Sequence, residues 1–215
     1  PHGATEVLDI TSQEGITRLS HPLLYQPTKP LLLVEGKYDV IFLKKAFSLL
    51  DINNAINIFC LEDMSSSGAS GGVDNLKSYI KEHKKAIKVR PHKAPIVVIL
   101  DWDAESKRKE FEKIIEGAPY KVLVWPTSRC NPNLSKSFKG IERYFSDRLI
   151  LEAETRGANL SRNRKGIISV DREEYDRVKD RLSAIVEKDL CREDLEFSGE
   201  FLREILNEAR LCSSD

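Results

Sequence analysis

The chain has 215 residues, of which 40% are hydrophobic and 32% charged, a balance typical of a folded globular protein and not of a disordered one. No apolar run approaches the roughly 20 residues that a membrane-spanning helix needs, so no membrane contact is expected. The four cysteines are scattered, without a Cys-x-x-Cys pair, which argues against a zinc site and favours a cytoplasmic location.

Charge is unevenly distributed, although the formal net charge is zero. Residues 29–150 carry 21 lysines and arginines against 15 aspartates and glutamates, whereas residues 151–215 carry 12 against 16. The basic excess in the middle of the chain suits a polyanionic partner such as nucleic acid.

The predicted elements alternate along the first two thirds of the chain. Residues 1–29 lack a sustained period and contain prolines, so we interpret them as a linker or N-terminal strap. Short apolar runs without alternation, typical of strands buried on both faces, follow at 31–35, 56–61, 96–101 and 121–125. Helical patterns at 39–50, 74–89 and 105–116 lie between them. This order predicts an α/β fold with a parallel, doubly wound sheet and right-handed crossovers.

The last third of the sequence is predicted to be helical. A polar loop at 126–139 precedes a helix at 141–154. Two amphipathic helices follow, the first starting with a capping-box-like pair, Asp171 and Glu174, and the second capped by Ser198. We divide the chain into a strap (1–29), a central domain (30–150) and a helical appendage (151–215) that serves as a scaffold or docking element.

Acidic residues end two of the predicted strands at the same relative position. Glu35 ends the first strand, with Asp39 four residues later, and Asp101 ends the third, followed by Asp103. Because neighbouring parallel strands are about 4.8 Å apart and ligand sites lie beyond their carboxyl ends, these side chains are expected to converge. Such carboxylates repel unless their pKa values rise or a cation lies among them, and oxygen ligands suit Mg²⁺ or Mn²⁺. The alternative is an ordinary set of exposed acids after strands.

These motifs resemble a known family. The pattern hydrophobic-Val-Glu35-Gly36-x-x-Asp39, a glycine-rich turn, and hydrophobic-Leu-Asp101-x-Asp103 resembles the Toprim domain of bacterial primases, topoisomerases, recombination proteins and several nucleases. The resemblance covers about residues 29–149, although the glycine that often follows the Asp-x-Asp pair is missing. It implies a Rossmann-like, four-stranded parallel sheet with helices on both faces. It also implies that Glu35 acts as general acid/base or metal ligand and that Asp101 and Asp103 bind Mg²⁺.

Nucleases are the branch of this family that the sequence resembles most. A primase or recombination protein would bring a cysteine cluster, and a topoisomerase would need a further domain. The Glu35–Asp39 spacing and the segment Lys139-Gly-Ile-Glu142-Arg-Tyr-Phe resemble the OLD (overcoming-lysogenization-defect) endonucleases. This implies that Glu142 is a further acidic ligand and that Lys136 or Lys139 is the active-site lysine. Alternatively, Lys139 is a solvated loop residue and Glu142 an acid favoured by a helix N-terminus.

The nuclease resemblance implies a two-metal mechanism with Mg²⁺ or Mn²⁺. Glu35, Asp39 and Asp101 then hold one ion that activates water, and Asp103 and Glu142 bound a second that stabilises the leaving oxygen. A lysine balances charge on the phosphate.

A glycine-rich loop at 65–72 precedes a predicted helix. Glycines let backbone amides approach a phosphate, and a helix N-terminus favours an anion, so Ser70, Gly71 and Gly72 are predicted to bind nucleic acid. Lys77 and Lys81 on the following helix are predicted to contact its backbone. A flexible surface loop and a solvated helix face are the alternatives.

The expected partners are nucleic acid, with DNA favoured over RNA, and an ATPase, because OLD proteins join this domain to one. No Gly-x-x-x-x-Gly-Lys-[Ser/Thr] motif occurs, so the ATPase is expected upstream or on another chain, and the start at Pro1 suggests a fragment. A homodimer is also compatible with the sequence. The rival functions are a Toprim ribonuclease that matures ribosomal RNA and a non-catalytic module that binds nucleic acid or a protein partner.

Overall fold

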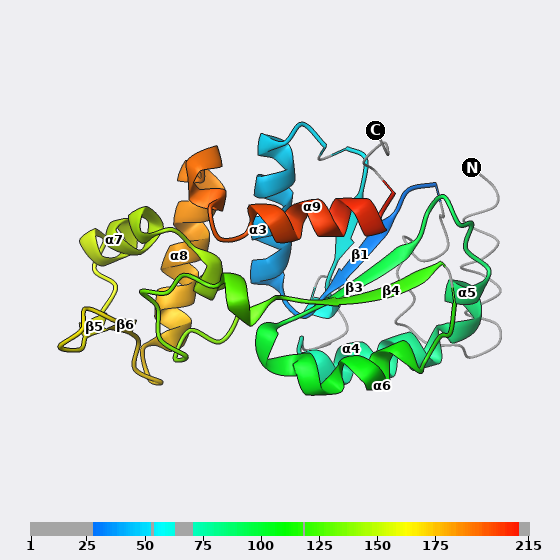
Figure 1. Ribbon diagram of the computed structural model, residues 1–215, viewed down its shortest axis with the longest axis horizontal. Helices are drawn as coiled ribbons and strands as arrows, with labels where there is room; N and C mark the ends of the chain where they lie inside the picture. The colour runs from blue at the N-terminus through cyan, green and yellow to red at the C-terminus, as the bar shows by residue number, and fades with distance from the viewer. Residues whose placement is uncertain (1–27, 53, 63–70, 118, 211–215) are drawn as a thin grey trace.

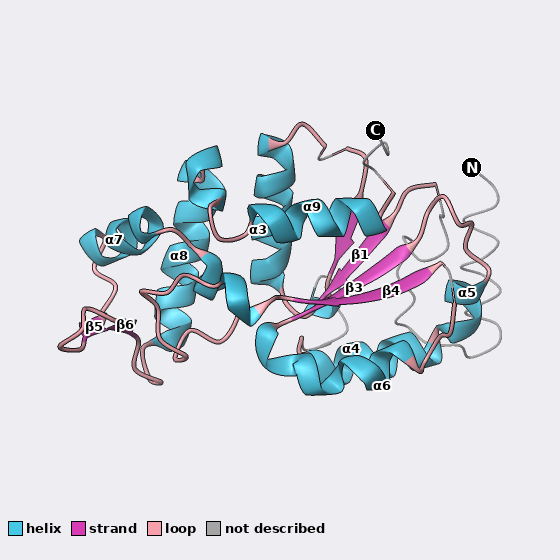
Figure 2. Cartoon of the chain, viewed as in Figure 1, coloured by secondary structure: helices cyan, strands magenta, loops and turns pink. Residues whose placement is uncertain are grey.

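The computed structural model describes residues 28–52, 54–62, 71–117 and 119–210. It contains a four-stranded, all-parallel sheet in the order β2-β1-β3-β4 (Figure 2). The predicted α/β class and parallel sheet are confirmed, whereas the predicted strap at 1–29 lies almost wholly outside the described residues. The four strands, each within or one residue from a predicted apolar run, are β1 (Leu31–Val34), β2 (Asn57–Phe59), β3 (Ile96–Leu100) and β4 (Tyr120–Val124).

Two hydrophobic cores lie on opposite faces of the sheet, because successive strand residues point to opposite sides. Leu32 and Val34 of β1 belong to one core, and Leu31 and Leu33 belong to the other. The predicted helices on both faces are therefore present (Figure 1). The first core contains α3 (Lys37–Leu49), α7 (Asp147–Thr155), α8 (Tyr175–Asp189) and α9 (Gly199–Glu208), and the second contains α4 (Val73–Glu82), α5 (Lys84–Lys88) and α6 (Arg108–Glu112).

Several predicted helices are shorter than expected or divided. The helix expected at 74–89 breaks at His83 between α4 and α5, and the one expected at 105–116 is a 3₁₀ turn followed by α6. The helix expected at 141–154 becomes a 3₁₀ turn and α7, because the Ser146 hydroxyl caps α7 by accepting the Leu149 N–H at 3.3 Å.

The predicted caps of the last two helices are wrong. The predicted cap Asp171 lies four residues before α8, and the residues that directly precede α8 and α9, Glu174 and Ser198, accept no capping hydrogen bond with their side chains. Both residues have helical backbone angles, and not the extended conformation that directs a capping side chain toward the first turn. A short antiparallel pair, β5 (Ser161–Arg162) and β6 (Ile168–Ser169), was not expected, because two residues are too few for a recognisable alternation.

The C-terminal helices share one core with the sheet. Phe201 of α9 packs on Trp125, which follows β4, with ring centroids 4.4 Å apart. Helix α8 packs along α3 (Figure 1). No described helix combines the length and the apolar character required to cross a membrane.

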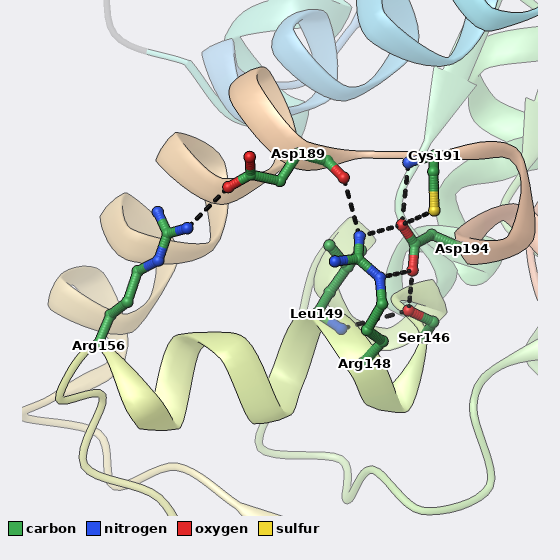
Figure 3. Close-up of polar contacts among 7 residues, drawn as sticks. All are labelled: Ser146, Arg148, Leu149, Arg156, Asp189, Cys191 and Asp194. Carbon is green, nitrogen blue, oxygen red and sulfur yellow. Dashed lines mark hydrogen bonds and ion pairs between the residues drawn. The ribbon is translucent and has the colours of Figure 1, made fainter.

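A polar network ties α7 to the segment after α8 (Figure 3). The Asp194 carboxylate accepts hydrogen bonds from the Ser146 hydroxyl at 2.6 Å, the Arg148 Nε at 2.9 Å and the Cys191 N–H at 3.0 Å. Arg148 also donates to the Asp189 carbonyl at 2.9 Å. Burial alone would raise the pKa of Asp194, but the hydrogen bonds, led by Arg148, hold that pKa well below its usual range.

Candidate functional site

Two acidic residues lie side by side where the adjacent strands β1 and β3 end. Val34 pairs with Ile99 in register, so Glu35 and Asp101 follow at the carboxyl edge of the sheet. The Asp101 N–H donates to the Glu35 Oε1 at 2.7 Å. The chain moves from β1 to β2 on one side and then returns to β3 on the other, so both residues lie at the switch point where open parallel sheets bind ligands.

Two further carboxylates, both almost fully buried, complete this group. Asp39, in the first turn of α3, is 8% exposed, and its Oδ2 accepts the Gly36 N–H at 3.0 Å. Glu142 is 2% exposed and accepts the Gly140 N–H at 3.1 Å. A Cβ atom at Gly140 would lie 2.9 Å from the Glu142 Oε2 and 3.4 Å from the Asp101 Oδ2, so only glycine allows this approach. We call Glu35, Asp39, Asp101 and Glu142 the carboxylate cluster.

Burial and crowded negative charge raise the pKa values of three members of the carboxylate cluster. Burial, and then repulsion by Glu142 and Glu35, raises the pKa of Asp39 to about 7. Burial and the neighbouring carboxylates, Asp39 first, raise the pKa of Asp101 well above its ordinary value. Burial also raises the pKa of Glu35, against the opposing hydrogen bond from Asp101. The cluster thus holds more negative charge than its protein donors offset.

Helix α8 supplies two side chains to the carboxylate cluster. The Lys179 Nζ lies 3.3 Å from the Glu142 Oε1, and the Tyr175 hydroxyl donates to the Glu142 Oε2 at 3.2 Å. The same hydroxyl accepts the N–H groups of Lys139 and Gly140, at 3.0 and 3.2 Å. Burial would lower the pKa of Lys179, but the carboxylates, Glu142 first, outweigh it and raise that pKa. Lys179 is therefore a protonated partner of the cluster.

The structure brings a different lysine to the site from those predicted. The side chains of Lys136 and Lys139 are exposed, and across the described residues Lys179 is the basic residue that forms an ion pair with the cluster. In the sequence, Tyr175 and Lys179 look like parts of an ordinary amphipathic helix. Their one signal is an i, i+4 spacing that places them on one helix face.

Two more acidic residues lie at the rim. Asp103 is exposed in the 3₁₀ turn after β3, close enough to contribute to the raised pKa of Glu35. Glu62, which the sequence analysis missed, is half-buried, and its Oε2 accepts the Lys37 N–H at 3.0 Å. Glu62 lies three residues beyond the end of β2, whereas Glu35 directly follows β1, so the available signal was an acidic residue shortly after a strand.

The glycine-rich loop meets the site at its C-terminal end. The Gly72 N–H donates to the Glu35 carbonyl at 3.0 Å, and a Cβ atom at Gly71 would lie 2.8 Å from the same oxygen. Gly71 therefore allows close packing against the end of β1, and Gly72 adopts a φ of 100° that favours glycine, whereas Ser70 lies outside the described residues. Lys77 forms an ion pair with Glu110, and Lys81 is exposed on α4.

The donor chemistry of the carboxylate cluster fits a hard divalent cation. All of its ligand atoms are carboxylate oxygens, and a cation would relieve the repulsion that, together with burial, raises the pKa values of Asp39 and Asp101. Over the described part of the chain, however, no group of three acidic, histidine or cysteine side chains is arranged to hold one ion. Glu35 instead binds the Asp101 N–H, and Glu142 binds Lys179 and Tyr175.

Comparison with protein-family models, with curated proteins and with solved structures yields no match for this chain. The fold and site define an α/β protein with a carboxylate cluster at the carboxyl edge of a parallel sheet.

Proposed function

We propose that the chain is a Toprim-like, metal-dependent nuclease of the OLD type that cleaves nucleic acid, with DNA preferred over RNA. The observation that carries this proposal is the carboxylate cluster with Lys179, gathered at the carboxyl ends of two adjacent parallel strands. Buried acids with raised pKa values at a sheet switch point are typical of functional sites, because burying repulsive charge lowers stability.

The proposed roles follow from the contacts of each residue. Glu35, Asp39 and Asp101 are the proposed ligands of one Mg²⁺ or Mn²⁺, and Asp103 and Glu142 of a second. Bound ions of this kind polarise phosphate oxygens and lower the pKa of coordinated water.

The residues of α8 and the segment before it have supporting roles. Tyr175, held by the N–H groups of Lys139 and Gly140, orients Glu142. Lys179 balances the charge of the cluster before substrate arrives, and its ammonium group can then pair with a phosphate oxygen. An ATPase, elsewhere in the same chain or on another chain, is the proposed partner that controls access of DNA.

The direct test is incubation of supercoiled plasmid and of a structured RNA with the protein in Mg²⁺, Mn²⁺ or EDTA. Cleavage is expected with either metal and not with EDTA. Glu35→Gln and Asp101→Ala should each reduce cleavage by about 100-fold or more, because each removes a charged ligand of the proposed metal ion. Glu204→Gln, on the exposed side of α9, is the matched control and should cleave normally. Normal cleavage by both site variants would remove the nuclease assignment.

A non-catalytic nucleic-acid-binding module is the second candidate. Its supporting observation is that Glu142 already has Lys179 and Tyr175 as partners, so part of the cluster is satisfied without metal. A parent protein that binds plasmid or RNA but cleaves neither in Mg²⁺ or Mn²⁺ would favour this candidate. Cleavage of RNA alone would instead favour the ribosomal-RNA maturase alternative.

A further inference from the structure

An open groove of about 480 Å³ runs along the exposed side of α3. Its lining is basic and apolar: Lys37, Lys44 and Lys45 lie among Val40 and Ile41, and Glu187 of α8 is its acidic residue within the described chain. We call it the α3 groove. The order of its lining residues along α3 shows that it extends from the first residue of the helix to near its end.

The lysines of the α3 groove differ from Lys77 of α4 in their ionic partners. Among the ion pairs that the structure describes, none includes Lys37, Lys44 or Lys45. On the opposite face of the sheet, Lys77 pairs with Glu110. The α3 groove thus presents uncompensated positive charge, whereas the predicted basic surface of α4 is partly neutralised.

The α3 groove begins at the carboxylate cluster. Lys37 lies two residues before Asp39, and Ile41 lines both the groove and a cavity of about 10 Å³ whose other walls include Glu142 and Lys179. The lysines of the α3 groove therefore extend a positively charged surface away from the carboxylate cluster, the proposed site of cleavage.

Helix geometry matches the groove to a polyanion with regularly spaced charges. Lys44 follows Lys37 by seven residues, so the two lie on one helix face roughly 10 Å apart along its axis. One strand of a nucleic-acid duplex advances about 3.4 Å per phosphate, so these lysines are about three nucleotides apart. The methyl groups of Val40 and Ile41 between them offer no competing polar contact.

We propose that the α3 groove binds the sugar–phosphate backbone of the nucleic acid on one side of the cleaved bond, with Lys37, Lys44 and Lys45 as the phosphate contacts. This inference rests on the proposed function and names the surface that positions its substrate. In this proposal α3, and not α4 as the sequence predicts, provides the principal basic surface for the phosphate backbone. Glu187 opposes binding by repelling the phosphates.

Fluorescence anisotropy with a labelled 30-base-pair DNA duplex in EDTA tests the proposal without cleavage. Lys44→Gln combined with Lys45→Gln should weaken binding about 10-fold at low salt and reduce the slope of log affinity against log salt by about 2, since each phosphate contact contributes about 0.9. Lys109→Gln with Lys113→Gln, two exposed lysines at and next to α6, is the matched control and should change neither. Glu187→Gln should tighten binding.

The outcomes separate this inference from the proposed function. If the parent protein cleaves DNA but the groove variants have the same affinity and salt slope as the parent, nucleic-acid binding in the α3 groove is overturned and the proposed function stands. A parent that neither binds nor cleaves DNA or RNA would overturn both. Sedimentation measures whether the groove variants lose self-association. If they do, and their DNA affinity is unchanged, the groove binds a second copy of the chain, and nucleic-acid binding there is overturned.

Discussion

Two buried acidic sites in this protein have opposite surroundings. Asp194 is a single carboxylate, 2% exposed, that accepts hydrogen bonds from a serine, an arginine and a backbone amide (Figure 3). The carboxylate cluster contains four carboxylates with Lys179 as its ion-pair partner within the described chain. The pKa of Asp194 is lowered, whereas the pKa values of Glu35, Asp39 and Asp101 are raised.

The difference lies in what surrounds the carboxylate: the same residue type serves stability at Asp194 and carries the proposed function in the carboxylate cluster. Around Asp194 the donors satisfy the charge, so ionisation favours the folded state. In the carboxylate cluster four carboxylates lie together with Lys179 as the cation that pairs with them among the described residues, so ionisation of Glu35, Asp39 and Asp101 opposes folding. A protein retains such a site when an incoming ligand offsets the charge, which is why the cluster, and not Asp194, carries the proposed function.

The largest effect on stability is expected from Asp194→Ala. The substitution removes the shared acceptor of Ser146, Arg148 and Cys191, and hydrogen bonds to a charged group contribute about 1.5–3 kcal/mol each, so we expect a loss of about 3 kcal/mol in the free energy of unfolding. Urea denaturation measures it. Asp189→Ala, which keeps the backbone carbonyl that Arg148 contacts, is the control and should cost much less. Equal losses in the free energy of unfolding would show that Asp194 contributes no more to stability than Asp189 does.

Lys179→Met should have the next largest effect. It removes the cation beside Glu142, which is 2% exposed, and a loss of about 2 kcal/mol is expected, below the range for a fully buried pair because Lys179 is partly exposed. Mn²⁺ should then raise the melting temperature of the variant more than that of the parent, because a bound cation replaces the missing charge. Lys188→Met, exposed on the same helix, is the control. A Mn²⁺ response equal to that of the parent would contradict this account.

Acid titration should distinguish the two sites without a substitution in the cluster. Because the pKa of Asp194 is lower in the folded than in the unfolded state, its stabilising contribution is complete above the unfolded pKa of about 3.9 and disappears as the pH falls through the folded value. The free energy of unfolding should therefore fall below about pH 4. In Asp194→Ala this acid-dependent loss should be smaller, and an identical pH profile would exclude Asp194 as its source.

The smallest effect, and one of opposite sign, is expected from Asp101→Asn. Removing one member of a repulsive group should leave the fold intact and raise stability by about 0.5–1 kcal/mol in EDTA at pH 8. Thermal denaturation of the parent and variant measures the difference. A loss comparable to that of Asp194→Ala would mean that Asp101 is a structural residue like Asp194.

Local patterns were enough to predict much of the fold and part of the site. Strands buried on both faces need continuous apolar runs, so β1, β3 and β4 are visible in the sequence, as are α3 and α8 from their helical period. Acids directly after β1 and β3 also predicted that Glu35 and Asp101 meet at the carboxyl edge of the sheet, although the register, in which Val34 pairs with Ile99, places Asp101 one residue beyond the level of Glu35. Metal binding and cleavage themselves stay predictions.

What the amino-acid sequence alone determined is the α/β class and the strand-end acids, because both follow from patterns within a few residues. The tertiary structure decided that Lys179, and not Lys136 or Lys139, pairs with Glu142, and that α8 belongs beside the carboxylate cluster. Lys179 follows Glu142 by 37 positions, and nothing in its neighbours along the chain distinguishes it from other lysines on a polar helix face. Its role arises only when the packing of α8 along α3 buries its ammonium group among carboxylates.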